Sequence, residues 1–266
     1  MINVPPEIEI ERSEGVQTIR IKRPDKKNAL LPAMYTAMHD ALVGGDADDA
    51  VRAHILTGAG GVFTAGNDII DFMSRAAGAP QPAGESPVHK FIGYLPRVEK
   101  PLIAAVDGLA VGVGVTMLFH CDLVYATPEA KLTTPFLNLG LVPEAGSSLL
   151  APRRMGHARA FEMLVLGETF SGERAREAGL VNAVVSADEL AAAARGAALK
   201  LAARPPAALK IARDLLRGAS IEETVERLEI ETGLFAERMK SPEAKEAFQA
   251  FVEKRAPDFD KLSDAG

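Results

Sequence analysis

A single carboxylate, Glu144, stands in a small, apolar stretch of the sequence where it could act as an acid or a base. The segment VPEAGSSL, residues 142–149, places it after a proline and before small residues. Apolar surroundings disfavour an ionised carboxyl group, so they raise its pKa and strengthen it as a base near neutral pH. A structural explanation is also open: the carboxylate could stabilise a helix that begins near Ala145, by about 0.3–1 kcal/mol.

Two glycine-bearing turns could bind an anion. The first, FTAGNDI at 63–69, comes after a strand-like run at 53–56, and the second, GLAVGVGV at 108–115, comes after another at 102–106. Each turn precedes a predicted helix, whose first N–H groups have no acceptor within the helix. Two such turns lying side by side can direct two donors at one oxyanion. The alternative for each turn is close packing, in which a glycine avoids a clash between helix and strand.

The remaining reactive residue types indicate little chemistry. Ser147 and Ser148 lack the G-x-S-x-G pattern of a nucleophilic serine and are better explained as residues at a helix start. Cys121 is the only cysteine, which excludes an internal disulfide and fits a reducing compartment. The histidines show no paired ligand spacing, so no metal site is expected; they are His39, His54, His89, His120 and His157.

The elements that must position these residues alternate between strands and helices. A hairpin is expected over 8–21, and a helix over 32–43 that Gly44 and Gly45 close. Together with the other strand-like runs this alternation predicts an α/β fold with mostly parallel pairing. Residues 76–87, rich in Ala, Gly and Pro, are expected to form a surface loop. The other strand-like runs are 53–56, 102–106, 123–126 and 181–185.

From Asp188 onward the sequence has four helical segments separated by Pro, Gly or Ser. Ser220 and Ser241 are predicted N-caps, and Ser220 with Glu223 has the spacing of a capping box. A helical tail that follows an α/β body indicates either a lid over the site or a contact between subunits.

Composition excludes several classes of function. The chain has 266 residues, enough for one large domain or a domain with an appendage, and its net charge of -6 gives no support to nucleic-acid binding. The N-terminal residues MINVPPEIEIER lack the basic and apolar regions of a signal peptide. The longest apolar run, 102–119, is interrupted by Asp107, so no membrane span is expected. We therefore expect a cytoplasmic protein without membrane partners.

Five motifs together resemble the crotonase superfamily, the enoyl-CoA hydratase/isomerase group, and they occur in the order found in that family. The resemblance implies a crotonase spiral of ββα units over residues 1–200 and a C-terminal helical trimerisation region over 201–266. It also implies a homotrimer or a homohexamer built as a dimer of trimers. The motifs are KRPDKKNAL (22–30), FTAGNDI (63–69), KPLIAAVDGLAVGVG (100–114), CDLVYATPEAKLTTPFLNLGLVPEAGSSLLAPRRMG (121–156) and GERAREAGLVNAVV (172–185).

The same resemblance implies an acyl-CoA thioester substrate, with coenzyme A as part of the substrate and no separate cofactor. The oxyanion donors would be the backbone N–H groups of Asn67 and Val113. Lys26, Lys27 and Lys254 are candidates for contacts to the CoA phosphates. The residues expected to border the substrate are Lys27, Ala29, Ala65, Gly66, Asn67, Asp68, Ile69, Gly112, Phe136 and Leu139.

Hydratases of this family use two glutamates, and both are missing here: their positions hold Thr116 and Phe136. Neither side chain can activate water or protonate carbon at neutral pH. Glu144, by contrast, resembles the catalytic base of the peroxisomal-type Δ3,Δ2-enoyl-CoA isomerases. We therefore expect an enoyl-CoA isomerase with Glu144 as its single acid and base. The alternatives are another crotonase reaction, such as hydration, thioester hydrolysis or dehalogenation, and a non-catalytic CoA-binding protein.

Overall fold

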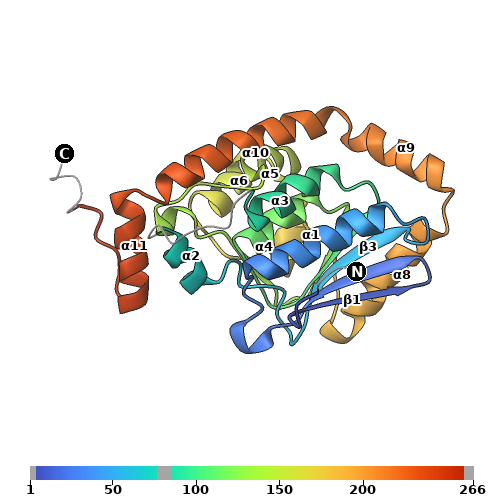
Figure 1. The fold of residues 1–266 in the computed structure, drawn as a ribbon, viewed down its shortest axis with the longest axis horizontal. Coiled ribbons are helices and arrows are strands. Elements are labelled where there is room, and N and C mark those ends of the chain that lie inside the picture. The colour runs from blue at the N-terminus through green and yellow to red at the C-terminus, as the bar shows by residue number, and fades with distance from the viewer. Residues whose placement is uncertain (1–3, 77–84, 261–266) are drawn as a thin grey trace.

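The computed structural model describes residues 4–76 and 85–260, and the main sheet of this part has six strands (Figure 1). The first two strands form an antiparallel hairpin, and the later pairings in this sheet are parallel. The predicted α/β fold is confirmed, although the last strand is shorter than the expected run 181–185. In order across the sheet the strands are β1 (Ile8–Ser13), β2 (Val16–Ile21), β3 (Ala53–Gly58), β4 (Leu102–Val106), β6 (Leu123–Ala126) and β9 (Ala183–Val184).

A second, smaller sheet within the described residues joins β5, β7 and β8, with β7 in the centre. These strands are β5 (Leu109–Val111), β7 (Lys131–Thr133) and β8 (Phe170–Ser171). The short 3-10 helices are η1 (Pro24–Lys26), η2 (Leu95–Arg97), η3 (Met117–His120) and η4 (Leu137–Leu139). The α-helices are α1 (Pro32–Asp46), α2 (Ile69–Ala76), α3 (Pro87–Tyr94), α4 (Val113–Thr116), α5 (Ser147–Met155), α6 (His157–Leu164), α7 (Gly172–Glu177), α8 (Ala187–Ala202), α9 (Pro206–Arg217), α10 (Ala219–Arg238) and α11 (Pro242–Glu253).

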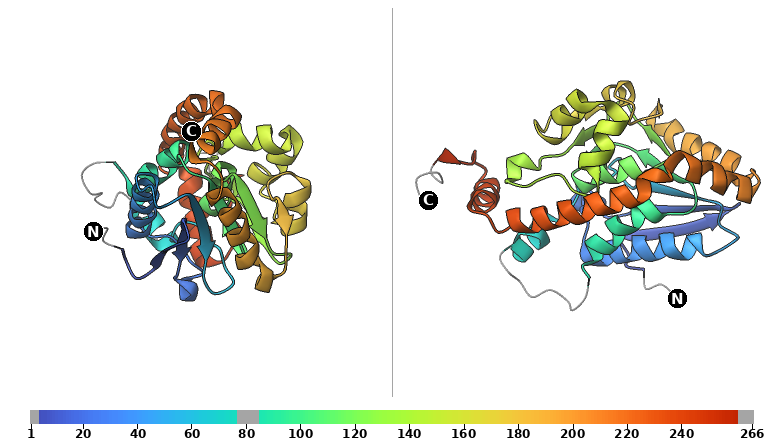
Figure 2. Two further views of the ribbon diagram at one scale, coloured as in Figure 1. Left: turned by 90° about the vertical axis from the view of Figure 1, so that its right-hand side faces the viewer. Right: turned by 90° about the horizontal axis from the view of Figure 1, so that it is seen from above.

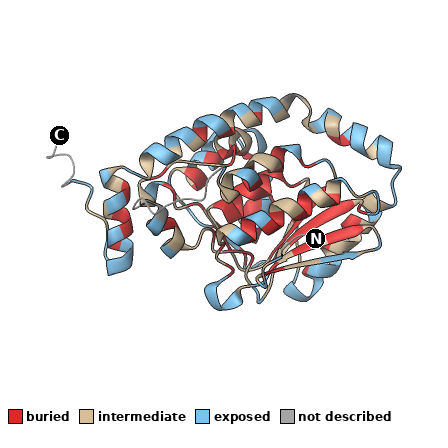
Figure 3. Cartoon of the chain, viewed as in Figure 1, coloured by how far each residue is buried: buried red, intermediate tan, exposed pale blue. Residues whose placement is uncertain are grey.

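Helices cover both faces of the main sheet, which explains why its central strands are apolar throughout. Successive side chains of a strand point to opposite faces. Ile55 of β3 accordingly belongs to a cluster with Leu190 and Ala194 of α8, whereas the next residue, Leu56, belongs to the large core shared with α1. Buried residues therefore gather in the strands and on the inner side of α1, as Figure 3 shows.

The first helix does not end where its glycines predicted. Helix α1 continues through Gly44 and Gly45 to Asp46. A Cβ atom on Gly45 would approach His54 Cε1 to 2.5 Å and Gln17 Nε2 to 2.7 Å. Gly45 is thus explained by the close approach of the helix to β2 and β3, a tertiary requirement that the local sequence does not reveal.

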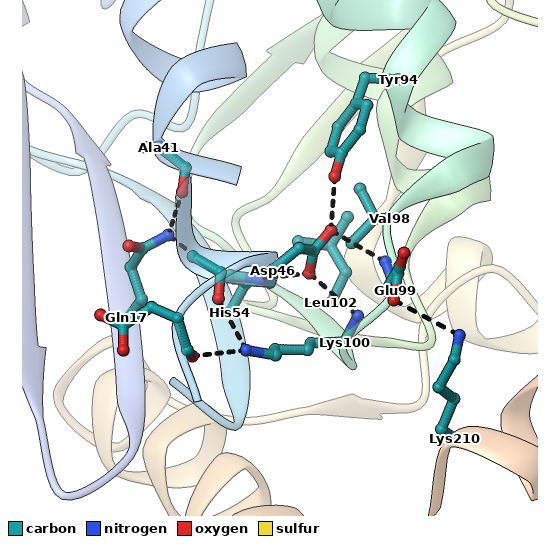
Figure 4. Close-up of polar contacts among 12 residues, drawn as sticks. Gln17, Ala41, Asp46, His54, Tyr94, Val98, Glu99, Lys100, Leu102 and Lys210 are labelled. Atoms are coloured by element: carbon teal, nitrogen blue, oxygen red, sulfur yellow. Dashed lines mark hydrogen bonds and ion pairs between the residues drawn. The ribbon is translucent and has the colours of Figure 1, made fainter. Parts of the chain in front are cut away.

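Asp46 joins this helix to the sheet through a buried polar network (Figure 4). Its carboxylate accepts hydrogen bonds from the Tyr94 hydroxyl at 2.8 Å and from the backbone of Glu99 and Lys100. The same carboxylate is 3.1 Å from His54 Nε2. The hydrogen bonds hold the pKa of Asp46 below its usual value despite burial. His54 is therefore a structural residue of the core.

The C-terminal helices differ from the prediction at one of their two expected caps. Ser241 caps α11, since its hydroxyl accepts a hydrogen bond from Ala244 N at 3.1 Å. The prediction for Ser220 was wrong: Gly218 keeps a helical backbone, α10 begins at Ala219, and the Ser220 hydroxyl donates to Arg217 O. Because α10 follows α9 with only Gly218 between them, the serine lies inside the helix.

Helix α10 crosses the body of the protein as one long element, and α11 lies at its far end beside α2 (Figures 1 and 2). Phe72 of α2 connects these helices, because its ring lies 6.1 Å from the ring of Phe235 on α10 and 5.5 Å from that of Phe248 on α11. Among the described residues, the helices do not include one long and apolar enough to span a membrane.

The two glycine-bearing turns lie side by side because their backbones pair. Thr64 N donates to Leu109 O at 2.9 Å, and Val111 N donates to Thr64 O at 3.0 Å. Gly66 makes this approach possible, since a Cβ atom there would lie 2.6 Å from Val111 O. The pairing brings the start of α2 and the start of α4 to one place, as two cooperating donors require.

Candidate active site

A cavity of about 400 Å³ lies where the two glycine-bearing turns meet the segment that carries Glu144. The first turn and α2 contribute Ala65, Gly66, Asn67, Ile69 and Phe72, and the second turn contributes Val111, Gly112 and Val113. The segment that leads to Glu144 contributes Pro135, Phe136, Asn138, Leu139, Leu141 and Glu144. The C-terminal helices and the residues after them contribute Phe235, Ala247, Phe251, Arg255 and Pro257.

The backbone N–H of Asn67 points away from Leu30, the residue with which Asn67 forms a parallel β-bridge. Leu30 N donates to Gly66 O at 2.8 Å, and Asp68 N donates to Leu30 O at 3.0 Å. In such a bridge the residue between the two bonded neighbours turns its own N–H to the opposite side. The Asn67 side chain is fixed separately, because its Oδ1 accepts a hydrogen bond from the Tyr35 hydroxyl at 2.8 Å.

The N–H of Val113 is available for a different reason. Val113 is the first residue of α4, and the first N–H groups of a helix have no acceptor in the preceding turn. Gly112, with φ of +56°, makes the sharp change of direction, and its own N–H donates to Thr133 O at 2.9 Å. The prediction that this turn opens a helix is confirmed, and Asn67 and Val113 are both among the residues that line the cavity.

Glu144 brings a carboxyl group to the same cavity. The Thr116 hydroxyl donates to Glu144 Oε1 at 2.5 Å. Burial raises the pKa of Glu144 to about 7; the Thr116 hydrogen bond acts in the opposite direction, and the charge of Glu231 adds to the increase. A carboxyl group with this pKa can both accept and return a proton near neutral pH.

The sequence left open that Glu144 stabilises the start of a helix. In the structure its side chain does not have that role for α5. That helix begins at Ser147, and the carboxylate of Glu231 on α10 accepts hydrogen bonds from Gly146 N and Ser148 N at 2.5 and 2.9 Å. Because another glutamate occupies the helix N-terminus, the Glu144 carboxyl group is left to the cavity.

Three of the residues expected beside the substrate do not line the cavity. These residues are Lys27, Ala29 and Asp68. Lys27 supports the first turn through its backbone, since Ala65 N donates to Lys27 O at 2.9 Å. Asp68 caps α2 by accepting a hydrogen bond from Ile70 N, and it also forms an ion pair with Arg23. Any contact of these three residues with CoA stays a prediction.

The sequence analysis missed the part of the cavity that the C-terminal segment supplies. Arg255 and Pro257 follow α11, where Lys254 adopts a left-handed conformation with φ of +55° and turns the chain. Arg255 is held by Glu246 at 2.6 Å and by Glu253 at 2.5 Å. A lid over the site was one of the two alternatives for the helical tail, but the basic residues at the end of its last segment, Lys254 and Arg255, gave no indication of which surface they would cover.

Comparison with known proteins identifies the family. The model of the family described as enoyl-CoA hydratase/isomerase matches residues 11–262. The chain belongs to the enoyl-CoA hydratase/isomerase family. It is 33% identical to the 1,2-epoxyphenylacetyl-CoA isomerase of Escherichia coli (strain K12), over 92% of this chain and 95% of that protein. It is 34% identical to enoyl-CoA delta isomerase 2 of Rattus norvegicus, over 91% of this chain and 62% of that protein.

Solved structures support the same family. The enoyl-CoA hydratase/isomerase of Pseudoalteromonas atlantica T6c superposes with a TM-score of 0.91 at 40% identity, over 95% of this chain and 99% of that one. The expected crotonase fold is thereby confirmed. Other relatives in the family are named 4-chlorobenzoyl coenzyme A dehalogenase and enoyl-CoA hydratase. The family therefore establishes an acyl-CoA enzyme of the hydratase/isomerase class and leaves the individual reaction to the residues of the cavity.

The raised pKa of Glu144 predicts that Glu144→Gln stabilises the protein at alkaline pH. The pKa is about 7 in the folded chain against 4.5 unperturbed, so the wild type loses stability as the pH rises through this window. One pKa unit corresponds to about 1.4 kcal/mol, and partial exposure reduces the full effect, so we expect a gain of about 1–2 kcal/mol at pH 8. Urea unfolding at pH 4.5 and pH 8 measures it.

The control for this comparison is Glu129→Gln, which changes an exposed glutamate in the turn before β7. We expect no comparable pH-dependent gain from it. Equal unfolding free energies for wild type and Glu144→Gln at pH 8 would contradict a desolvated carboxyl group at position 144.

Proposed function

We propose that the protein is a Δ3,Δ2-enoyl-CoA isomerase that converts 3-enoyl-CoA to trans-2-enoyl-CoA in the degradation of fatty acids or related acyl chains. One observation supports this assignment above all. Glu144 is the only carboxylate among the described residues that line the cavity, and its pKa is raised to about 7. A double-bond shift needs one group that removes a proton and returns it, whereas hydration needs two.

The first step is removal of a proton from C2 of the substrate by the Glu144 carboxylate. The electrons of the broken C–H bond delocalise through the double bond and the carbonyl group, which gives a dienolate with its charge on the thioester oxygen. The N–H groups of Asn67 and Val113 stabilise that oxygen, and loss of one such donor costs about 3–4 kcal/mol in well-studied enzymes. Peptide donors need no particular side chain, so a valine serves at position 113.

The second step returns the same proton to C4. The double bond then lies between C2 and C3, in conjugation with the thioester, and Glu144 is again ionised. The Thr116 hydroxyl holds Oε1 of the carboxyl group through both steps. No atom is gained or lost by the substrate, so the proposed reaction needs neither a metal nor a cofactor apart from the CoA that the substrate carries.

The residues at the two positions of the hydratase glutamates favour isomerisation. Thr116 is fully buried and its hydroxyl is bonded to Glu144, and Phe136 presents a ring to the cavity. Neither can activate water. Dehalogenation or thioester hydrolysis remains the alternative within the family, because a cavity carboxylate can also act as a nucleophile or activate water. A CoA-binding protein without catalysis is the third possibility.

The activity assay follows conversion of 3-hexenoyl-CoA to trans-2-hexenoyl-CoA by ultraviolet absorbance of the conjugated product. We expect Glu144→Ala to lower kcat by about 10³-fold, because general acid–base groups contribute about 10²–10⁴-fold. Glu129→Ala should leave the rate unchanged. If no isomerisation occurs, release of free CoA from acyl-CoA substrates would indicate thioester hydrolysis. Release of chloride from chloroaroyl-CoA substrates would indicate dehalogenation. CoA binding without any turnover would support the non-catalytic alternative.

Replacing Thr116 by valine tests the hydrogen bond to the base. The bond favours ionised Glu144, so its loss should raise the pKa of Glu144 above 7, by about one unit. In a plot of kcat against pH, the rise on the acidic side should therefore move to higher pH. Activity should be reduced at pH 7 and recover at pH 9. Thr116→Ser retains a hydroxyl and should leave the pH dependence of kcat unchanged. An unchanged pH dependence in Thr116→Val would argue against this bond.

We further propose that the protein is a cytoplasmic homotrimer or homohexamer, with residues 201–266 as the trimerisation region. Leu215 and Leu216 of α9 are 81% and 89% exposed, and such apolar patches typically mark contact surfaces. Sedimentation should give a trimer or hexamer, and the double variant Leu215→Asp, Leu216→Asp should dissociate it. Leu166→Asp, at an exposed leucine outside α9, should not. A monomeric wild type would contradict the assembly.

A further inference from the structure

The turn that presents Glu144 has an unusual backbone. Ala145 and Gly146 follow the glutamate with φ values of +57° and +73°. A left-handed conformation costs an alanine about 1–2 kcal/mol, so contacts elsewhere must hold it. Without them Ala145 would relax, and the direction of the preceding side chain would change.

His120 of η3 holds the first of these two residues. Its Nε2 lies 2.7 Å from Ala145 O, and because a carbonyl oxygen can only accept, Nε2 carries the hydrogen. The ring is buried, and burial lowers its pKa to about 3, with Arg217 and Arg154 acting in the same direction. His120 is therefore a neutral donor throughout the pH range in which Glu144 titrates.

Glu231 of α10 holds the second residue. Its buried carboxylate accepts hydrogen bonds from Gly146 N at 2.5 Å and from Ser148 N at 2.9 Å. Thr224, seven residues earlier on the same helix, packs against the turn so closely that a Cβ atom on Gly146 would lie 2.9 Å from its Cγ2. Residues seven apart lie on one face of a helix, so α10 contacts this turn along a single face.

We infer that Glu231 is a positioning residue for the catalytic base: its carboxylate locks the Ala145–Gly146 turn and takes the N-terminus of α5, so that the Glu144 carboxyl group faces the cavity. This inference rests on the proposed function, since it assigns Glu231 a role in proton transfer only through Glu144. Glu231 does not line the cavity.

The negative charge of Glu231 also affects the pKa of the Glu144 carboxyl group. The charged groups that interact with it are Glu144 and Arg227 on its own helix, and Arg227 also reaches the Ser148 hydroxyl at 3.4 Å. His120 on η3, which bonds to the same turn at Ala145 O, is neutral. The negative charge of Glu231 raises the pKa of Glu144. Removing that charge should therefore lower the pKa of the base.

The test compares Glu231→Gln with Glu223→Gln. Glu223 also connects α10 to α5, through Arg153 at 2.6 Å, but that pair is exposed. We expect Glu231→Gln to lower kcat by about tenfold or more, with KM changed less, because a small displacement of a catalytic group is costly. The acidic limb of the kcat profile should move to lower pH by about 0.5–1 unit. Glu223→Gln should change neither.

Glu231→Asp separates position from charge and provides a conservative variant if glutamine prevents folding. It keeps the charge but shortens the side chain by one methylene, so we expect a limb at the wild-type pH with a reduced kcat. Wild-type kcat and an unmoved limb in Glu231→Gln, or losses no larger than those of Glu223→Gln, would overturn the inference.

A ligand-free measurement distinguishes this inference from the proposed function. The Glu144 carboxyl carbon can be titrated by NMR in glutamate-labelled protein, with Glu144→Gln providing the assignment. A lower Glu144 pKa in Glu231→Gln, with faster amide exchange at Gly146, would support the inference even if no isomerisation were detected. An unchanged Glu144 pKa and unchanged exchange would contradict it even in an active isomerase.

Discussion

Desolvation of the Glu144 carboxyl group is the constraint on which the other features of the site depend. A carboxylate in an apolar cavity favours its protonated form, and the hydrogen-bond donor to this one within residues 4–76 and 85–260 is the neutral hydroxyl of Thr116. The result is a pKa near 7, which suits the proposed role of a group that accepts a proton and returns it. A cation beside the carboxylate would have lowered the pKa, and the one arginine among the described lining residues, Arg255, is instead paired with Glu246 and Glu253.

Backbone geometry supplies the other half of the chemistry. The two N–H groups come from turns that are distant in sequence and that meet because Thr64 pairs with residues on either side of Ala110. Their positions depend on the path of the main chain, so glycines matter more than the side chains beside them. With the proposed oxyanion donors built into the backbone, a few side chains around the α, β and γ carbons would decide the reaction, which fits a family that hosts several acyl-CoA reactions on one fold.

Helix α10 connects the base to the rest of the molecule. One of its faces holds the turn after Glu144 through Thr224 and Glu231, and Phe235, one turn further along, lines the cavity and meets Phe72 of α2. The C-terminal helices are thus part of the site as well as candidates for subunit contact. Ile230 and Leu234 of α10 remain exposed in the single chain, so a partner that covers them would contact the same helix whose Glu231 carboxylate bonds to the turn after Glu144.

The sequence by itself determined the α/β fold and the two glycine-bearing turns, and it singled out Glu144 as the candidate acid–base group. The first two depend on local chemistry, namely alternating apolar runs and glycines before helix starts. The choice of Glu144 depended on the resemblance to the family, which implies that the hydratase glutamates are replaced by Thr116 and Phe136. Local patterns misjudged Gly45 and Ser220, where packing against distant strands and the continuation of one helix into the next override the usual stop and start signals. Only the tertiary structure decided that Thr116 bonds to Glu144, that Arg255 reaches the cavity, and that Glu231 rather than Glu144 occupies the start of α5. The hydrogen bonds of Thr116 and Glu231 join residues 28, 83 and 85 positions apart, and no local pattern encodes which distant side chain satisfies a buried group.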